Sequence, residues 1–542
     1  MSINRRDLVT WAGAGLAATL PALAQPLSAS ASAKTATAST APASGFNVRH
    51  FGAVGDGKNL DSKAINAAIE AAADAGGGTV YFPAGVYASY SIRLKSHITL
   101  YLDQGAVILA ESTPHEGTTG EGYDAAEPQG AWEPYQDYGH NHWHNSLIWG
   151  ENIHDIAILG QGLIWGKGLS RGWEKQLDLP LSGKPGVGNK AIALKNCHNV
   201  LLRDFYILQG GWFGILATGV DNLTIDNLTI DTNRDGMDID CCNNVRVSNC
   251  TVNSPWDDGI CPKSSYALGY ARITENVTIT NCFVTGGYQL GSVIDGTWKE
   301  HEPGQKVYKN GRIKFGTESN GGFRNITVSN CVFDKSHGFI LESEDGAICE
   351  DITLTNITMR DTAGSPIFIR LGSRMRGPKD AKVGYIRRLL INNISSSGAT
   401  VLPSIISGVP GYAIEDVKIS DVYLHQAGGA SAEMATLDPP ENETQYPDPE
   451  MFGEIPATGF FLRHIKNLEM SNVEIATEAP DPRPAFWLKN VDGADFFRLR
   501  VPRNNSTGPT PVFDLRQVKD FRVFGSQFIP DFANADIETK KL

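Results

Sequence analysis

The chain alternates polar and aliphatic residues in short segments that recur from about residue 150 onward. A typical copy is NVTITNC at 276–282, in which every second residue of the first part is aliphatic. Related copies lie at 222–227, 244–250, 325–331, 351–354, 416–419 and 467–470. A period of two predicts a short β-strand with one aliphatic face. Copies that return every ~22 to 50 residues are typical of the coils of a solenoid.

A single strand of this kind cannot bury its aliphatic face alone, so we expect the copies to stack. Stacking in register would place neighbouring strands ~4.8 Å apart and align equivalent asparagines and cysteines into ladders. The predicted fold is all-β, a single-stranded, right-handed parallel β-helix. One helix is expected at 62–75, where Ile65, Ala68, Ile69 and Ala72 share a face. This helix would cap the open N-terminal end of the solenoid.

The N-terminus is predicted to be an export signal. Residues 1–24 contain paired arginines, Arg5 and Arg6, then an apolar stretch and the small-residue sequence ALA at 22–24. This order is typical of a twin-arginine signal peptide, and the apolar run is too short to favour a membrane anchor. We expect a flexible linker at 25–44, a β-helix catalytic domain at 45–535, and export to the periplasm or medium of a bacterium.

Composition narrows the choice of partner. The formal net charge of the 542 residues is -13, which disfavours binding to nucleic acid or to an anionic membrane by bulk electrostatics. No segment after the signal is long and apolar enough to span a bilayer, so we expect no membrane association once the signal is removed. An acidic substrate would need a few locally placed cations. We expect a monomer.

The eight cysteines predict no metal site. Cys250, Cys282 and Cys331 occupy the same position of the repeat, which favours stacked core thiols over metal ligands. Cys241 and Cys242 are too close for a zinc site, and no matching histidine spacing follows. We therefore expect neither a metal nor another cofactor.

Three acids are predicted to converge on two successive coils. If the following strands are in register, Asp235 aligns with Asp258 one rung away, ~5 Å, and Asp257 lies beside them. Like charges held this closely raise at least one pKa, which keeps one carboxylic acid protonated while another remains a base. Each Asp-Gly pair could instead be an ordinary turn. Two stacked pairs with an additional acid favour a catalytic site.

Two cations are expected on the outward face of a later coil. Arg312 and Lys314 flank Ile313, so the period of two places both side chains on one face. They would suit the binding of a substrate carboxylate. They could also simply neutralise the aspartates.

These motifs resemble glycoside hydrolase family 28, the polygalacturonases and related pectin hydrolases. The resemblance extends from the opening phrase at 51–57 to about residue 480. The family's Asn-Thr-Asp motif is similar to 233–235, its Gly-Asp-Asp motif is similar to 256–258, and its Arg-Ile-Lys motif is intact at 312–314. The order and separation of the motifs make the resemblance specific. It implies the pectin-lyase-like form of the β-helix.

The resemblance also implies residue roles. Asp257 would be the general acid that protonates the leaving oxygen, and Asp235 and Asp258 would activate the water. Arg312 and Lys314 would hold the substrate carboxylate. The implied function is inverting hydrolysis of galacturonosidic bonds in acidic plant cell-wall polysaccharide or oligosaccharide. Inverting enzymes usually separate acid and base by ~6.5 to 9.5 Å, more than one rung of a stack.

The sequence departs from the family pattern at two places. Arg234 replaces the central threonine of Asn-Thr-Asp, and GYQLGS at 287–292 stands where the family has Gly-His-Gly. Tyr288 is expected to replace the family histidine as a hydrogen-bond partner. Both Arg234 and Tyr288 are therefore candidate substrate-binding residues. His337 is followed by glycine as in the family motif, but it lies after the Arg-Ile-Lys motif and is assigned to a different coil.

Long connections predict how the cleft is bounded. Loops at 296–311, 372–384 and 426–454 are long for solenoid turns and could wall off one end, which favours exo action. The segment 140–145 is rich in residues that line sugar clefts, although it could equally be a polar loop over the first coils.

Other functions remain open at this point. The chain could act on rhamnogalacturonan or another acidic glycan, or it could be a polysaccharide lyase with a base and often calcium. A non-catalytic adhesin or tailspike-like glycan binder is the remaining alternative.

Overall fold

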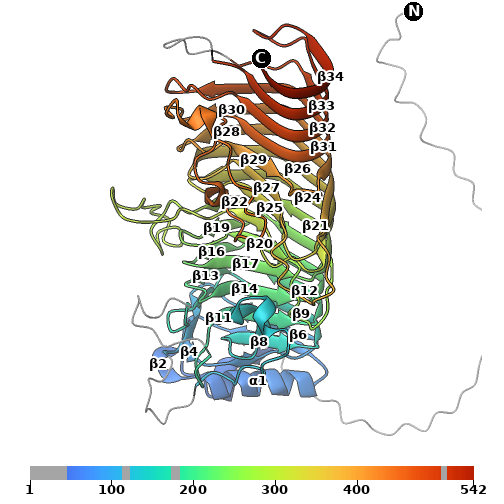
Figure 1. Cartoon of the computed structure of the whole chain (residues 1–542). Helices are drawn as coiled ribbons and strands as arrows, with labels where there is room; N and C mark the ends of the chain where they lie inside the picture. The colour runs from blue at the N-terminus through green and yellow to red at the C-terminus, as the bar shows by residue number, and fades with distance from the viewer. Residues whose placement is uncertain (1–44, 113–121, 172–182, 502–509) are drawn as a thin grey trace, which may run out of the picture. The chain divides into compact units, whose positions relative to one another are not determined.

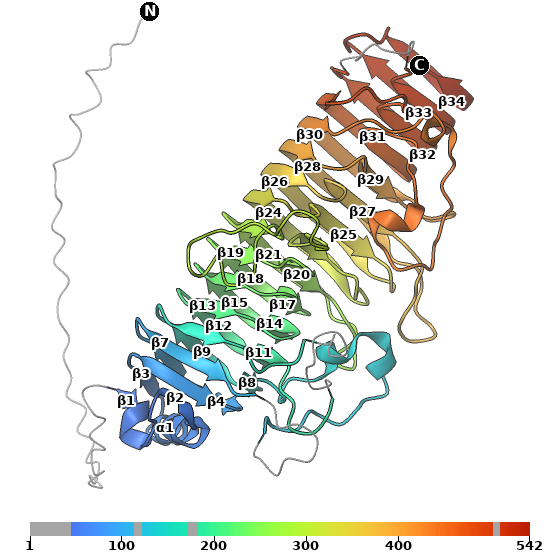
Figure 2. The same cartoon turned by 90° about the vertical axis from the view of Figure 1, so that its left-hand side faces the viewer.

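The strands of this protein stack in parallel, each paired with strands one coil before and one coil after it. The computed structural model describes residues 45–112, 122–171, 183–501 and 510–542. Within them, 34 strands join one continuous sheet that winds from helix α1 to β34 (Figures 1 and 2). The expected parallel β-helix is confirmed. The predicted signal peptide and linker lie outside the described residues.

The first coils contain the helices α1 (Ser62–Asp74), η1 (Val48–Phe51), η2 (Glu133–Tyr135) and η3 (Tyr138–Asn141). Their strands are β1 (Phe46–Asn47), β2 (Asp56–Leu60), β3 (Gly78–Phe82), β4 (Gly85–Ser89), β5 (Ile92–Arg93), β6 (Ile98–Leu102), β7 (Ala106–Ala110), β8 (Ile148–Glu151), β9 (His154–Leu159) and β10 (Leu163–Trp165).

The central coils contain β11 (Lys190–Lys195), β12 (His198–Arg203), β13 (Tyr206–Leu208), β14 (Phe213–Thr218), β15 (Asp221–Asp226), β16 (Thr229–Asp231), β17 (Asp235–Asp240), β18 (Asn243–Ser248), β19 (Thr251–Asn253), β20 (Ile260–Lys263), β21 (Thr274–Thr280), β22 (Phe283–Thr285) and β23 (Ile313–Phe315).

The last coils contain β24 (Gly322–Asp334), β25 (Phe339–Ser343), β26 (Ile348–Thr362), β27 (Ile367–Leu371), β28 (Tyr385–Gly398), β29 (Ser404–Ser407), β30 (Ile414–Gln426), β31 (Phe460–Thr477), β32 (Phe486–Phe497), β33 (Phe513–Phe524) and β34 (Phe532–Lys541). They also include η4 (Met434–Thr436) and η5 (Pro449–Phe452). The pairing of β33 with β34 is antiparallel.

The aliphatic residues of the repeat form continuous rows inside the coils. Ile225, Val247, Ile279 and Val328 are register partners on β15, β18, β21 and β24, and all four are fully buried. Each coil therefore buries its aliphatic face against its two neighbours, which a lone strand cannot do. The register of the whole stack follows from this shared core.

Ladders of identical side chains run along the turns, as expected. Asn222, Asn244, Asn276 and Asn325 all adopt the left-handed conformation, which Asn tolerates well. Each amide Nδ2 donates to the amide oxygen of the preceding coil, at 2.7–3.2 Å for the three steps between these four residues. The eight cysteines are buried and unbridged, in agreement with stacked core thiols.

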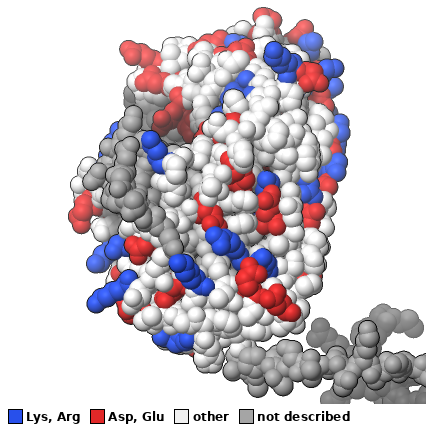
Figure 3. Space-filling view, turned by 90° about the horizontal axis from the view of Figure 1, so that it is seen from below, with Lys and Arg blue, Asp and Glu red and all other residues white. Residues whose placement is uncertain are grey.

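Helix α1 covers the first coil. Its buried face consists of Ile65, Ala68, Ile69 and Ala72, preceded by Ser62, which confirms the predicted capping helix. The helix lies against β1, β3 and β5 at one end of the stack (Figure 2). Seen from this end, Lys and Arg are interspersed with Asp and Glu (Figure 3). None of the described helices is long and apolar enough to cross a membrane.

Replacement of a core aliphatic should weaken the stack strongly. Ile279→Ala is expected to cost about 2–5 kcal/mol of unfolding free energy, because it removes buried methyl groups and leaves a cavity between coils. Thr278→Ala, at the neighbouring and partly exposed position, is the control. The urea midpoint of each variant measures the difference. Equal effects of the two substitutions would contradict the inward row.

Candidate active site

The stacking register brings Asp235 and Asp258 together. Met237 on β17 pairs with Ile260 on β20, so the two aspartates are one coil apart at the same level. The backbone N–H of Asp258 donates to Asp235 Oδ1 at 3.1 Å and to Asp257 Oδ1 at 3.2 Å. One carboxylate oxygen from each of the three acids lies within 4.8 Å of the others. The three candidate catalytic side chains therefore occupy one site.

Arg312 and Lys314 are directed at one member of this group. The Arg312 Nε donates to Asp258 Oδ1, and the Lys314 Nζ lies 3.5 Å from Asp258 Oδ2. Both cations are almost fully buried. Burial alone would raise the pKa of Asp258, but Arg312 and Lys314 outweigh it and hold the pKa well below its usual range. These two cations therefore neutralise Asp258, which is the alternative that the sequence left open for them.

Asp235 has the opposite electrostatic environment. Its carboxyl is buried, and burial raises its pKa well above the usual range. The negative charges of Asp257, Asp238 and Asp258 raise it further. The surroundings therefore favour the protonated form of Asp235 and the ionised form of Asp258. Separated pKa values of this kind are what an acid and a base in one site require.

Arg234 contacts an acid of the group. Its Nε lies 3.1 Å from Asp257 Oδ2, and its guanidinium lies over the ring of Trp212 at 4.6 Å from the centroid. Its Nη1 donates to the backbone oxygen of Arg171. Arg234 therefore orients Asp257 and joins the site to residue 171 on a preceding coil.

Asp257 and Arg312 line a cleft of about 700 Å³ beside the stack. The sequence did not predict the other lining residues one by one, but six of the eleven lie in the expected loops 296–311 and 426–454. The eleven are Arg171, Asn233, Trp256, Leu290, Lys306, Tyr308, Asn310, His337, Tyr446, Asp448 and Glu450. Asp235, Asp258 and Lys314 lie beneath this surface.

Two of the three long loops border the cleft as expected. The loop 296–311 contributes Lys306 and Tyr308, and the loop 426–454 contributes Tyr446 and Asp448. The loop 372–384 contributes no lining residue. Its arginines instead bind acids of the stack, as Arg374 does with Asp345. The expectation that it walls the cleft is therefore wrong, because its charged side chains are occupied in an internal ion-pair network.

The structure does not place Tyr288 beside Asp235, Asp257 and Asp258. Its hydroxyl donates to Asp334 Oδ2 at 2.9 Å. His337 instead lines the cleft with Asp257, although it belongs to a later coil. Burial lowers the pKa of His337 to about 4, so its ring is neutral. Turns of neighbouring coils lie side by side, so a histidine shifted by one coil still reaches the same cleft.

The segment 140–145 packs over the sheet on one side of the acids. Trp143 is buried in a cluster with Ala193, Phe213, Leu216 and Ala267. Trp143 is therefore a buried packing residue with no room to line a sugar cleft, and it covers central coils, not the first coils.

Two groups of acids in the described residues have the spacing of cation ligands and are neutralised by protein cations. In the aspartate group, Arg312 and Lys314 neutralise Asp258, and Arg234 pairs with Asp257. In the group Glu127, His144 and Glu151, the Lys195 Nζ lies 3.0 Å from Glu151. A bound metal ion would have to displace these ammonium and guanidinium groups, which disfavours metal binding at both places.

The raised pKa of the Glu342 carboxyl predicts that the free energy of unfolding depends on pH. This buried carboxyl lies behind Arg312 and Lys314, and burial raises its pKa to about 7 in spite of both cations. The folded protein therefore binds this proton more tightly than the unfolded chain, and stability falls as the pH rises from ~4.3 to about 7. Glu342→Gln removes the titration. We expect its melting temperature, relative to wild type, to be higher at pH 8 than at pH 5.

Glu350→Gln is a control of opposite sign. Hydrogen bonds from Arg387 lower the pKa of Glu350, so its stabilising contribution is present above ~4.3 and lost on acidification. Relative to wild type, this variant should lose stability as the pH rises toward ~4.3 and should show no further change between pH 5 and pH 8. Parallel melting curves for wild type and Glu342→Gln at both pH values would contradict a buried, protonated Glu342.

Comparisons with known proteins agree with this architecture. Residues 45–260 match the family model "Rhamnogalacturonase A/epimerase, pectate lyase-like", and residues 190–380 match "Right handed beta helix region". A probable polygalacturonase of Vitis vinifera is 25% identical over 419 residues, covering 70% of this chain and 74% of that protein.

Two solved structures share the fold. An exopolygalacturonase of Thermotoga maritima has a TM-score of 0.56 at 19% identity, covering 79% of this chain and 91% of that one. A family 28 exopolygalacturonase of Yersinia enterocolitica has a TM-score of 0.57 at 19% identity, covering 89% and 78%. The findings confirm the right-handed β-helix and the resemblance to family 28, and they indicate a glycoside hydrolase.

Proposed function

We propose that this chain, a glycoside hydrolase of the family 28 type, cleaves galacturonosidic bonds at the ends of pectic chains by an inverting mechanism. The observation that carries the proposal is the group of three acids at the cleft, with one oxygen from each of Asp235, Asp257 and Asp258 within 4.8 Å of the others and Asp257 on the cleft surface. Burial and neighbouring charges favour the protonated form of Asp235, and Arg312 and Lys314 favour the ionised form of Asp258. The paired arginines at positions 5 and 6 support an exported enzyme that acts in the periplasm or medium.

Asp257 is assigned as the general acid because it alone of the three lines the cleft. An oxygen of Asp235 lies within 4.8 Å of an oxygen of Asp257, so a proton of Asp235 can pass to Asp257 through one water. Transfer to Asp257 leaves Asp235 and Asp258 ionised. Asp257 then protonates the leaving oxygen while a water attacks the anomeric carbon. The proton of that water passes to Asp235 or Asp258.

Because the acids lie close together, the anomeric configuration of the product distinguishes an inverting mechanism from a retaining one. Oxygens within 4.8 Å are nearer than the ~6.5 to 9.5 Å usual between the acid and base of inverting enzymes. Inversion requires Asp257 to turn into the cleft and admit a water. Retention would require one aspartate to attack the sugar directly. Proton NMR of the first product distinguishes the two, and we predict the anomer opposite to that of the bond cleaved.

Arg171 is the cation best placed to receive a substrate carboxylate. It lines the cleft, and burial lowers its pKa without any acid to offset the cost. With the Asn233 amide in its hydrogen-bonding orientation, the amide oxygen accepts from Arg171 Nη1 at 2.6 Å and fixes the guanidinium. Arg312, in contrast, is already paired with Asp258 and Asp448. An incoming carboxylate would complete the coordination of Arg171.

The loop 426–454 supports exo action. The buried Arg463 donates to the backbone oxygens of Pro439 and Pro440, and Arg370 donates to that of Glu441. At the cleft, the Tyr446 hydroxyl accepts from Lys314 at 3.1 Å. The loop is therefore tied to the stack at both places. A fixed wall at one end of a cleft favours chain ends over the middle of a polymer.

Product analysis tests the proposed reaction. Incubation with oligogalacturonates should release monomers or dimers from chain ends, with slow loss of viscosity of the polymer. Asp257→Asn should reduce the rate ~10²- to 10⁴-fold and leave the melting temperature unchanged, because general acid catalysis supplies a factor of this size. Rhamnogalacturonan serves as the alternative substrate.

Each competing function has a distinct outcome. Rapid viscosity loss indicates endo action, and a rise in ultraviolet absorbance that a chelator abolishes indicates a lyase. Turnover of rhamnogalacturonan alone would change the substrate but keep the acids. Binding without products, unaffected by Asp257→Asn, would overturn catalysis altogether.

Arg171→Gln should separate binding from chemistry. We expect a KM for oligogalacturonate raised about tenfold or more and a kcat within a fewfold, because the guanidinium would bind a substrate carboxylate equally in the ground state and in the transition state. Arg360→Gln, which removes one exposed positive charge outside the cleft, is the matched control. An unchanged KM in Arg171→Gln would contradict the role of Arg171.

A further inference from the structure

The asparagine ladder ends on a different set of side chains near the α1 end of the stack. Along the ladder each amide donates to the preceding coil, and Asn199 Nδ2 donates to Asp155 Oδ1 at 2.8 Å. Asp155 is an acceptor only, so the ladder stops there. The register of β6 with β9 places His97 at the equivalent position one coil earlier. Both residues are left-handed, with φ of 63° at His97 and 53° at Asp155.

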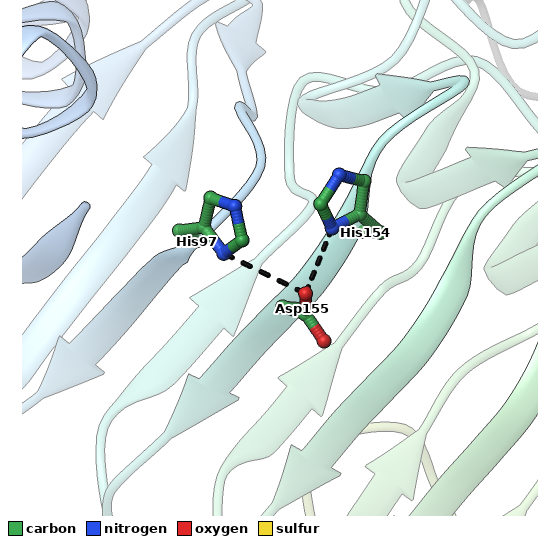
Figure 4. A group of neighbouring side chains, drawn as sticks. All are labelled: His97, His154 and Asp155. Atoms are coloured by element: carbon green, nitrogen blue, oxygen red, sulfur yellow. Dashed lines mark hydrogen bonds and ion pairs between the residues drawn. The ribbon is translucent and has the colours of Figure 1, made fainter. Parts of the chain in front are cut away.

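Two imidazoles face the second oxygen of Asp155 (Figure 4). The Nδ1 of His154 lies 2.8 Å from Asp155 Oδ2, and the Nδ1 of His97 lies 3.5 Å from the same oxygen. All three ligand atoms lie within 4.8 Å of one another. The three side chains are partly exposed, so an ion can enter from solvent.

We propose that His97, His154 and Asp155 form a binding site for one divalent transition metal ion, such as Zn²⁺. A tetrahedral zinc ion with bonds of ~2.0–2.1 Å holds its ligand atoms about 3.3 Å apart. The observed 3.5 Å already matches this separation, and the 2.8 Å contact has to open by a fraction of an ångström. Water would complete the coordination. Two imidazoles and one carboxylate suit zinc, copper or nickel better than magnesium or calcium.

The surroundings hold the ligands in place. The amide of Asn199 fixes Asp155 through Oδ1 and leaves Oδ2 for the ion, as outer hydrogen bonds do at metal sites. The ring of His154 stacks on that of His198 with centroids 4.9 Å apart. The backbone N–H of His97 donates to the His154 oxygen at 3.0 Å, so the two coils keep a fixed spacing.

This group differs from the other two acid groups in its charge. Among the described residues, no Lys or Arg forms an ion pair with Asp155, whereas Lys195 neutralises Glu151 and Arg312 neutralises Asp258. An ion at Asp155 displaces only imidazole protons. Because the bound ion joins side chains of two successive coils, it would cross-link the first coils and stabilise this end of the stack.

The test uses the full chain without a histidine tag, stripped with chelator and titrated with Zn²⁺. Calorimetry should show binding at this site, and saturating Zn²⁺ should raise the melting temperature. His97→Asn should lower the affinity at least tenfold and abolish the rise, because Asn tolerates the left-handed conformation but supplies no imidazole. Its metal-free melting temperature should equal that of wild type, which separates metal binding from folding.

Two control variants locate the ion. His425→Gln, on β30, keeps all three ligands and their neighbours and should bind like wild type, and His144→Gln removes the alternative group at Glu127 and Glu151 without effect on this site. Mg²⁺ should produce no shift. Equal Zn²⁺ binding by wild type and His97→Asn would overturn the proposal and leave Asp155 as a carboxylate capped by two histidines. So would a loss of binding in His144→Gln alone.

Discussion

The register between successive coils is the constraint on which the rest of this structure depends. Parallel backbone hydrogen bonds fix the spacing of neighbouring strands, and the shared aliphatic core fixes which residues lie opposite one another. A slip of one residue would turn the inward row of Ile225, Val247 and Ile279 outward. The same slip would separate Asp235 from Asp258. Folding and the assembly of the acid group are therefore one event.

Stacking concentrates charge as well as hydrophobic surface. Identical backbone positions on neighbouring coils bring like charges within a few ångströms, and burial makes their repulsion strong. Two cations from a later coil, Arg312 and Lys314, stabilise Asp258 as an anion, whereas burial and the neighbouring acids raise the pKa of Asp235. The difference in protonation arises from which carboxyl the cations reach.

The sequence predicts the features that repeat from coil to coil, but it does not predict the contacts made by single residues of irregular loops. Period-two alternation and aligned Asn and Cys positions are properties of single coils and their neighbours, so the fold, the ladders and the convergence of Asp235, Asp257 and Asp258 could all be predicted. The length of the loop 426–454 predicted a place at the cleft, but not that Tyr446 is the side chain that reaches it. Arg171 and His337 reach the cleft from other turns. The local sequence around them does not predict this contact, because loop paths depend on tertiary packing.

Tyr288 is a second case in which the sequence did not predict the contact of a side chain. A gap in a family motif suggested a local replacement, yet the tyrosine hydroxyl binds Asp334 and a histidine of the next coil borders the cleft. In a solenoid, neighbours in space can be one coil apart in sequence. A side chain on one coil can therefore take the place of a side chain on the adjacent coil. The order of motifs in the sequence does not reveal such a replacement, but the stacked structure does.

A crystal structure of Asp257→Asn with a bound oligogalacturonate tests the central claim most directly. The account predicts a chain end in the cleft, with the glycosidic oxygen in hydrogen-bonding distance of the side chain at position 257 and a sugar carboxylate on Arg171. Asp235 and Asp258 should lie beneath it in their stacked positions. A sugar bound on another face, or acids that point away from it, would contradict the account.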